Sequence, residues 1–146
     1  MKLYLDNCTI QRPLDDRKQL RIAIEGEIIL NILSLIEAQQ IELISSEVLV
    51  YEAQKITNIF RKEFTLKVLS RSSEFIQLDD EIEIRSETFI NSGIKPIDAL
   101  HLASSEKSGA DLFCTCYDNF LKKANKMTDL RIKAVSIFDL LKEIEK

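Results

Sequence analysis

Residues 94–120, IKPIDALHLASSEKSGADLFCTCYDNF, decide the fold class of this chain. Their spacing predicts a helix over 96–109, opened by a proline and ended by a glycine, and then a buried strand over 111–115. Asp98 falls in the first turn of that helix, where free backbone N–H groups stabilise a negative charge. Asp118 follows the strand, at the edge where open parallel sheets bind their ligands. Two acids from separate segments are therefore expected at one edge of a sheet.

The rest of the chain repeats this alternation of strands and helices. Apart from 111–115, the predicted strands are 2–5, 41–44, 75–78 and 131–135. Such an order favours a three-layer α/β/α sandwich with a mainly parallel five-stranded sheet. Candidate N-caps of the helices that follow are Ser45 or Ser46, the pair Asp79 and Asp80, and Ser136.

Three further expectations concern the segments between these strands. Residues 11–19 are expected to form a polar loop, in which Asp15 and Asp16 cap the long helix that ends near Gln39. Residues 57–72 are expected to continue the helix that contains Glu52.

Composition restricts the class of protein. The net charge of −4 and the pI of about 5.1 give no global basic field, so nucleic acid would have to be bound by local patches. Such patches are expected at 55–71 and 122–133, although a basic run is most often just a solvated face. No signal peptide or membrane-spanning run is recognised, and a cytoplasmic location is expected. The three cysteines are expected to be reduced thiols, because they form no pattern of disulfides or of a zinc site.

Four acids are predicted to meet at the carboxyl edge of the sheet. Asp6 ends the first strand, Glu52 lies at the margin of an apolar helix stripe, and Asp98 and Asp118 flank the fourth strand. Asp6 would equally suit a simple turn. Carboxylate clusters repel one another unless cations neutralise them, and hard oxygens select Mg²⁺ or Mn²⁺. The pattern therefore favours metal-assisted phosphodiester hydrolysis. His101, the only histidine, is either a packing residue or a contact to metal or substrate.

The chain resembles the PIN-domain ribonucleases, which include the VapC-like toxin nucleases. The motifs that carry the resemblance are LYLDNC at 3–8, SSEVLVYEA at 45–53, KPIDALHLASSEKSGAD at 95–111 and FCTCYDNFLKKA at 113–124. The family's first three acids fall on Asp6, Glu52 and Asp98. At the fourth acid position this chain has Tyr117, and Asp118 lies one place later. Asn7 and Thr115 are possible groups that orient the acids.

The resemblance implies a single PIN-like domain over residues 1–146. It implies a Mg²⁺- or Mn²⁺-dependent endoribonuclease that cleaves single-stranded RNA, in which Asp6, Glu52, Asp98 and Asp118 are catalytic residues and metal ligands. It also implies a homodimer and, if the chain is a toxin, an antitoxin protein as a partner. One alternative is a catalytically weak PIN-like module that acts by binding protein or RNA, with Tyr117 marking the lost activity. A phospho-accepting receiver domain is disfavoured, because Asp6 is followed by Asn7 rather than by a second acid.

Overall fold

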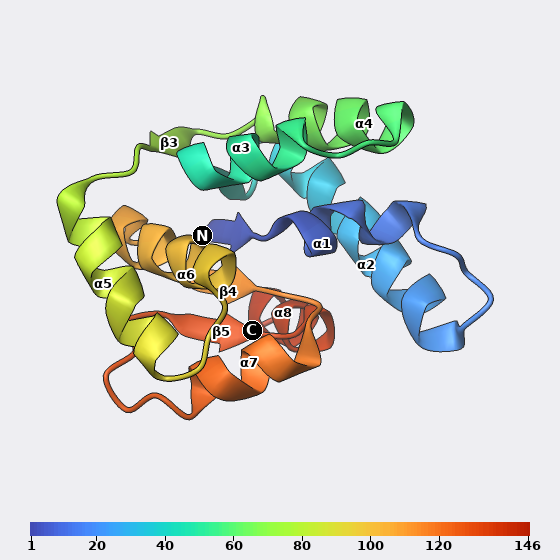
Figure 1. Cartoon of the computed structure of the whole chain (residues 1–146). Coiled ribbons are helices and arrows are strands. Elements are labelled where there is room, and N and C mark those ends of the chain that lie inside the picture. The colour runs from blue at the N-terminus through green and yellow to red at the C-terminus, as the bar shows by residue number, and fades with distance from the viewer.

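A computed structural model of residues Met1–Lys146 shows a five-stranded sheet whose strand pairs are all parallel (Figure 1). The strand order is β3-β2-β1-β4-β5. The strands are β1 (Lys2–Leu5), β2 (Glu42–Ser46), β3 (Glu74–Ile76), β4 (Leu112–Cys114) and β5 (Lys133–Val135). The predicted α/β sandwich is confirmed, and each strand lies within about two residues of its predicted bounds.

Helices connect the strands and cover both faces of the sheet. They are α1 (Asn7–Gln11), α2 (Leu20–Glu37), α3 (Glu47–Gln54), α4 (Ile59–Leu69), α5 (Asp80–Asn91), α6 (Pro96–Ser108), α7 (Asp118–Asn125) and α8 (Ile137–Ile144), with a 3₁₀ turn η1 (Arg12–Leu14) after α1. The chain runs from β1 toward β3 on one side and from β4 toward β5 on the other. Right-handed crossovers therefore place α5, α6 and α7 on the face opposite to α2 and α8, which pack together.

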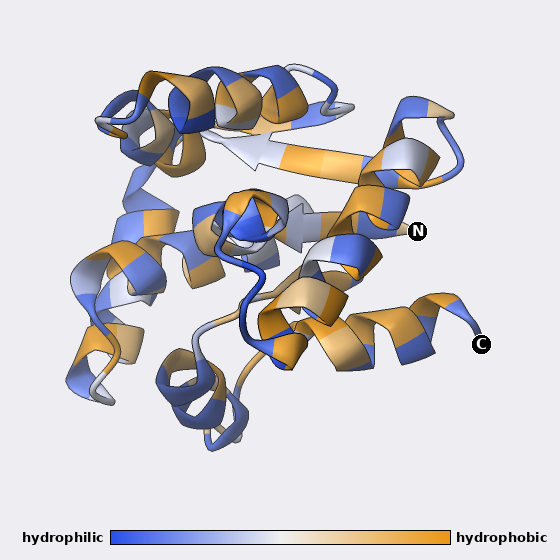
Figure 2. Cartoon of the chain, turned by 90° about the vertical axis from the view of Figure 1, so that its right-hand side faces the viewer, coloured by the Kyte–Doolittle hydropathy of each residue, from blue (hydrophilic) through white to orange (hydrophobic).

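The two central strands form the middle of the core. Leu3, Tyr4 and Leu5 of β1 and Phe113 of β4 are fully buried, and Tyr4 is in register with Phe113. Figure 2 shows that the helices carry alternating hydrophobic and hydrophilic stripes, so that each has an apolar side to pack inward. No helix has both the length and the apolar character needed to cross a membrane.

Local signals in the sequence account for most helix ends. The side chains of Ser46, Asp79 and Ser136 each accept a hydrogen bond from a backbone N–H in the first turn of the following helix, as predicted. Gly109 ends α6 with φ of 70°, a left-handed conformation that glycine adopts without steric cost.

The prediction of one continuous helix through 57–72 was wrong. The helical conformation of α3 ends at Lys55, and α4 begins anew after Asn58. The Oδ1 atom of Asn58 accepts hydrogen bonds from the backbone N–H groups of Phe60 and Arg61. A side chain that caps a new helix in this way stabilises a break, which hydrophobic spacing alone does not reveal.

The expected loop over 11–19 is also partly helical. Its first residue is the last of α1, and its next three residues form η1. Asp15 does not cap α2: its carboxylate accepts hydrogen bonds from the guanidinium groups of Arg12 and Arg61. Asp16 accepts a hydrogen bond from the backbone N–H of Lys18, and no side chain caps α2. Asp15 therefore forms ion pairs with two arginines instead of capping α2.

Candidate active site

Asp6 lies at the end of β1, where the sheet order reverses between β1 and β4. This switch point is where open α/β sheets form a crevice. The Oδ1 atom of Asp6 caps α1 by accepting hydrogen bonds from the Thr9 backbone N–H at 3.1 Å and hydroxyl at 2.7 Å, and it accepts a third from the Cys8 thiol at 3.0 Å. No group donates to Oδ2. The cap therefore fixes the side chain of Asp6 and leaves one oxygen free.

Glu52, on α3, faces Asp6 from the neighbouring crossover. Its Oε1 atom accepts hydrogen bonds from Asn7 Nδ2 and from His101 Nε2, both at 2.8 Å, and no group donates to Oε2. Burial by itself would raise the pKa of Glu52, but these hydrogen bonds and the proximity of the His101 ring outweigh it and lower the pKa. The carboxylate of Glu52 is therefore held ionised and oriented.

His101 belongs to a chain of buried polar groups behind Glu52. Its Nδ1 atom lies 2.8 Å from the hydroxyl of Tyr4, which lies 2.7 Å from the hydroxyl of Ser46. The hydrogen bonds can run in one direction if Ser46 donates to Tyr4, Tyr4 to Nδ1, and Nε2–H to Glu52. The sequence indicates His101 as a candidate but does not reveal its link to Tyr4 and Ser46, because these residues lie 97 and 55 positions earlier in the chain.

Asp98 enters the same space from the first turn of α6. It makes no ion pair within the chain, and no group donates a hydrogen bond to it. Burial raises its pKa, and the negative charges of Asp6 and Glu52 raise it further, against the weaker attraction of His101 and Lys95. The ionised form of Asp98 is therefore disfavoured by its burial and by the charges of the two other acids.

These three acids line one hollow of about 190 Å³, called the acid pocket from here on. The complete lining is Asp6, Asn7, Cys8, Gln11, Glu52, Ile56, Asp98, His101 and Tyr117. The structure thus brings together three of the four predicted acids from β1, α3 and α6.

The fourth predicted acid, Asp118, is not among the residues of the acid pocket. Its carboxylate accepts two hydrogen bonds from the guanidinium of Arg21, at 2.8 and 3.0 Å, and the side chain is largely exposed. This bidentate ion pair lowers the pKa of Asp118. Asp118 is the first residue of α7 and is directed toward the start of α2 by a partner 97 positions away.

Tyr117 takes the place of an acid in the pocket wall. Its backbone N–H donates to the Thr115 hydroxyl at 3.1 Å, and its ring is about half exposed. Burial of the other half, together with neighbouring Cys8, raises the pKa of the phenol. Tyr117 is therefore neutral and does not substitute for a carboxylate ligand. Thr115 contacts Tyr117 and Cys8, not the acids, whereas Asn7 does contact Glu52.

The donor set of the acid pocket fits a hydrated divalent cation. No three His, Cys, Asp or Glu side chains are arranged so that they enclose one ion together. Asp6, Glu52 and Asp98 nevertheless each present at least one carboxylate oxygen to which no group in the protein donates. Mg²⁺ keeps several waters and is usually bound by one or two carboxylates together with substrate phosphate. These free oxygens suit such a partly hydrated ion better than a closed protein cage.

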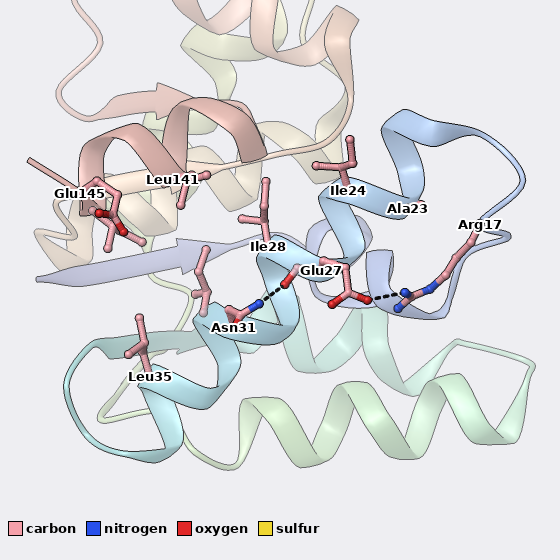
Figure 3. A pocket seen from close by; sticks show the side chains of 11 residues that line it. Arg17, Ala23, Ile24, Glu27, Ile28, Asn31, Leu35, Leu141 and Glu145 are labelled. Carbon is pink, nitrogen blue, oxygen red and sulfur yellow. Dashed lines mark hydrogen bonds and ion pairs between the residues drawn. The ribbon is translucent and has the colours of Figure 1, made fainter.

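A second hollow, of about 550 Å³, lies between α2 and α8 (Figure 3). Its walls are mainly aliphatic, with Ile24 and Ile28 of α2 facing Leu141 of α8. Two of its three charged side chains, Arg17 and Glu27, pair with each other. No titratable groups converge there as they do in the acid pocket, so this hollow is not a second catalytic candidate.

Each of the two predicted basic patches contains side chains that other groups of the chain engage and side chains that make no ion pair. In the first, Arg61 donates to the side chains of Gln11 and Asp15 and to the carbonyl of Leu14, so it holds α4 against the turn that follows α1. In the second, Lys122 makes no ion pair and Lys123 donates only to a backbone carbonyl. Lys62 and Lys67 of α4 also make no ion pair within the chain, so free positive charge lies on both helices, and only that of α7 is on the same side of the sheet as α6.

A parallel sheet with three acids that converge at its switch point defines an α/β protein whose site is at the carboxyl edge of its strands. The chain belongs to the PIN domain family, because the model of that family matches residues 9–126. PIN domains are generally nucleases. The matched segment contains Glu52 and Asp98, and Asp6 lies three residues before its start.

Solved structures similar to this chain show the same fold. VapBC2 from Rickettsia felis, bound to a DNA fragment from its promoter, superposes with a TM-score of 0.61 at 14% identity, over 93% of this chain and 98% of the other. DNA-bound VapBC from Salmonella typhimurium gives 0.58 at 17% identity, over 94% and 98%. PAE2754 from Pyrobaculum aerophilum gives 0.56 at 14% identity, over 99% and 90%. A search among curated proteins found no match to the sequence.

Proposed function

We propose that this chain is a Mg²⁺- or Mn²⁺-dependent endoribonuclease that cleaves single-stranded RNA. The observation that carries the proposal is the acid pocket, in which Asp6, Glu52 and Asp98 converge, each with a free oxygen and with no lysine or arginine bonded to it. Membership of the PIN domain family supports the same reaction class.

The roles of the residues follow from their contacts. Asp6 is held by its cap on α1, and Glu52 by Asn7 and His101, so both present a fixed oxygen to the pocket. Asp98 supplies further negative charge without an internal partner. A bound divalent cation would acidify a water molecule and offset the charge that develops on the phosphate. Fixed carboxylates of this kind lower the cost of arranging the reacting groups.

Asp118 is given no direct role in this proposal. Its carboxylate is engaged by Arg21, and a site of three acids is sufficient for a cation that keeps its waters.

The test is cleavage of a mixed-sequence single-stranded RNA by the purified chain in Mn²⁺, beside an EDTA control. Asp6→Asn is the sharpest variant, because asparagine is as good an N-cap as aspartate and keeps α1 capped while it removes the charge. We expect cleavage only with metal, and a loss of about 100-fold or more in Asp6→Asn and in Asp98→Asn, since a metal site contributes several kcal/mol. Equal cleavage by these variants would refute the assignment.

One observation favours a second candidate, a PIN-like module that acts by binding. Tyr117 occupies the position at which the resemblance places a fourth acid, and it is neutral. A chain that binds RNA or protein but shows no metal-dependent cleavage with any single-stranded RNA would support this reading. Loss of cleavage in Asp98→Asn would exclude it.

The partners proposed for this chain are an antitoxin protein and a second copy of itself. The solved VapBC structures from Rickettsia felis and Salmonella typhimurium support the first, because they have the fold of this chain. Co-expression with the product of a neighbouring gene, followed by co-purification and loss of cleavage, would test the antitoxin. Light scattering on the purified chain would distinguish a dimer from a monomer of 16.8 kDa.

A further inference from the structure

The acid pocket opens into a larger groove. A hollow of about 960 Å³ lies between the start of α6 and α7, and it shares Glu52, Asp98 and Tyr117 with the acid pocket. Because three residues border both hollows, the two form one continuous depression. We call its larger part the α6–α7 groove. In Figure 1 these two helices lie one above the other on the same side of the sheet.

The groove carries positive charge that the fold does not use. Lys95 precedes α6 and Lys122 lies on α7, and neither side chain makes an ion pair or hydrogen bond within the chain. Lys123 donates to the carbonyl of Gly93. Most other cations of the chain are engaged, for example Arg21 with Asp118 and Arg85 with Glu106. Unpaired lysines beside unpaired carboxylates suit a ligand that carries phosphates along the groove and a cation at its end.

Tyr117 stands where the groove meets the acid pocket. The residue is 54% exposed, and no hydrogen bond engages its hydroxyl. The backbone is fixed by the bond to Thr115, and Phe120, one turn later, anchors α7 in the core. An exposed aromatic side chain on a fixed backbone is a feature on which single-stranded nucleic acids stack their bases.

We infer that the α6–α7 groove binds the nucleotide of single-stranded RNA adjacent to the cleaved phosphate. Its base stacks on Tyr117, and its neighbouring phosphates lie against Lys95 and Lys122. Tyr117 thus acts as a substrate-positioning residue and not as a metal ligand. This inference rests on the proposed nuclease function, since it places the reacting phosphate in the acid pocket.

The test compares RNA binding by variants of the full chain. Fluorescence anisotropy with a labelled mixed-sequence 12-mer RNA in EDTA measures Kd without cleavage, and steady-state kinetics in Mn²⁺ separate KM from kcat. We expect Tyr117→Leu to weaken binding by about 5- to 100-fold, the usual loss for one stacked base, and to raise KM more than it lowers kcat. Tyr117→Phe should stay within about 3-fold of the unmodified chain, because it keeps the ring.

Tyr51 provides a matched control. It is 52% exposed on α3, its ring lies under the Lys55 ammonium, and it borders neither hollow. Tyr51→Leu should therefore leave Kd unchanged. Equal weakening by Tyr51→Leu, or no weakening by Tyr117→Leu, would overturn the assignment of the groove while leaving the metal-dependent cleavage of the unmodified chain intact. If the unmodified chain neither binds nor cleaves RNA, both the groove and the nuclease are refuted.

A charge variant tests the groove without touching a packed residue. Lys95→Gln with Lys122→Gln should weaken binding and reduce the slope of log K against log salt by about 1.4, since each contact to a single strand contributes about 0.7. The control is Lys67→Gln with Lys142→Gln, which also removes two positive charges, but from α4 and α8, away from the groove. An identical change of slope in both double variants would show a diffuse charge effect and would overturn the groove as a site.

Discussion

Two regions of this molecule bury carboxylates in opposite ways. Glu25, on α2, is fully buried and is paired with Arg12 at 3.0 Å and Arg21 at 3.4 Å. Asp15 and Asp118 extend this arrangement, which we call the arginine network, because each pairs with one of the same arginines. The acid pocket, in contrast, holds three carboxylates with no arginine or lysine bonded to any of them.

The difference separates acids that stabilise the fold from acids that are available to a ligand. A buried carboxylate with matched guanidinium groups is neutralised within the protein. Carboxylates without such partners are neutralised by protonation or by a cation from solution. The amino-acid type is the same in both regions, so the partners decide the role.

The largest effect on stability is expected in the arginine network. Glu25→Gln leaves two guanidinium groups short of their buried partner and should lower the free energy of unfolding by about 3 kcal/mol. Urea unfolding at pH 7 measures it. Glu27→Gln is the matched control, because Glu27 forms an exposed pair with Arg17, and its change should stay within about 0.5 kcal/mol. A Glu25→Gln change as small as that of the control would remove the distinction between the two regions.

The next effect concerns the support of Glu52. His101→Leu removes the hydrogen bond to Oε1 and should weaken Mn²⁺ binding by about 10- to 100-fold, the usual cost of losing a group that orients a metal ligand. Calorimetric titration measures it. His101→Gln retains an N–H donor and should recover part of the affinity, whereas a purely packing role would give the two variants the same metal affinity.

A smaller effect, an increase in the stability of the fold, is expected when Asp98 is replaced by asparagine. Its pKa is raised in the folded chain, so its ionised form opposes folding at every pH above that raised value, and the penalty disappears below the unfolded value of about 3.9. Asp98→Asn should therefore raise stability by about 0.5–1 kcal/mol at pH 7 and by less as the pH falls toward 4. Urea unfolding at both pH values checks this prediction. A variant that is less stable than the parent at pH 7 would contradict it.

The smallest effect is expected at Asp118. The pair with Arg21 is largely exposed, so Asp118→Asn should change stability by no more than about 0.5 kcal/mol. RNA cleavage should fall by less than about 3-fold if the carboxylate is not a metal ligand. A loss as large as that of Asp6→Asn would return Asp118 to the site.

Sequence reasoning predicted the elements of the fold because their signals are local. Ser46, Asp79 and Ser136 each cap a helix by accepting from a backbone N–H three residues later, and Gly109 marks a left-handed turn. The break at Asn58 was missed because the apolar spacing of α3 and α4 reads as one stripe. Capping geometry, not hydrophobic period, decides that boundary.

The candidate site could be predicted only as far as strand order allowed. Asp6, Glu52 and Asp98 each lie at a position that a parallel sheet brings to its carboxyl edge, and they do meet. The direction of Asp118 depends on Arg21, which no local pattern connects with it. The chain from Ser46 through Tyr4 to His101 likewise joins residues that are adjacent only after folding.

The central position of β1 also determines when the site can form. Leu3 pairs with Leu43 on one side and with Leu112 on the other, so the first strand completes its pairing only with the last third of the chain. Asp98 and Tyr117 flank that last partner. During synthesis, the acid pocket therefore cannot exist until β4 has left the ribosome, although Asp6 is made well before β4. Until then a nascent chain of this protein carries Asp6 without its catalytic surroundings, and the activity we propose arises only after β4 has joined the sheet.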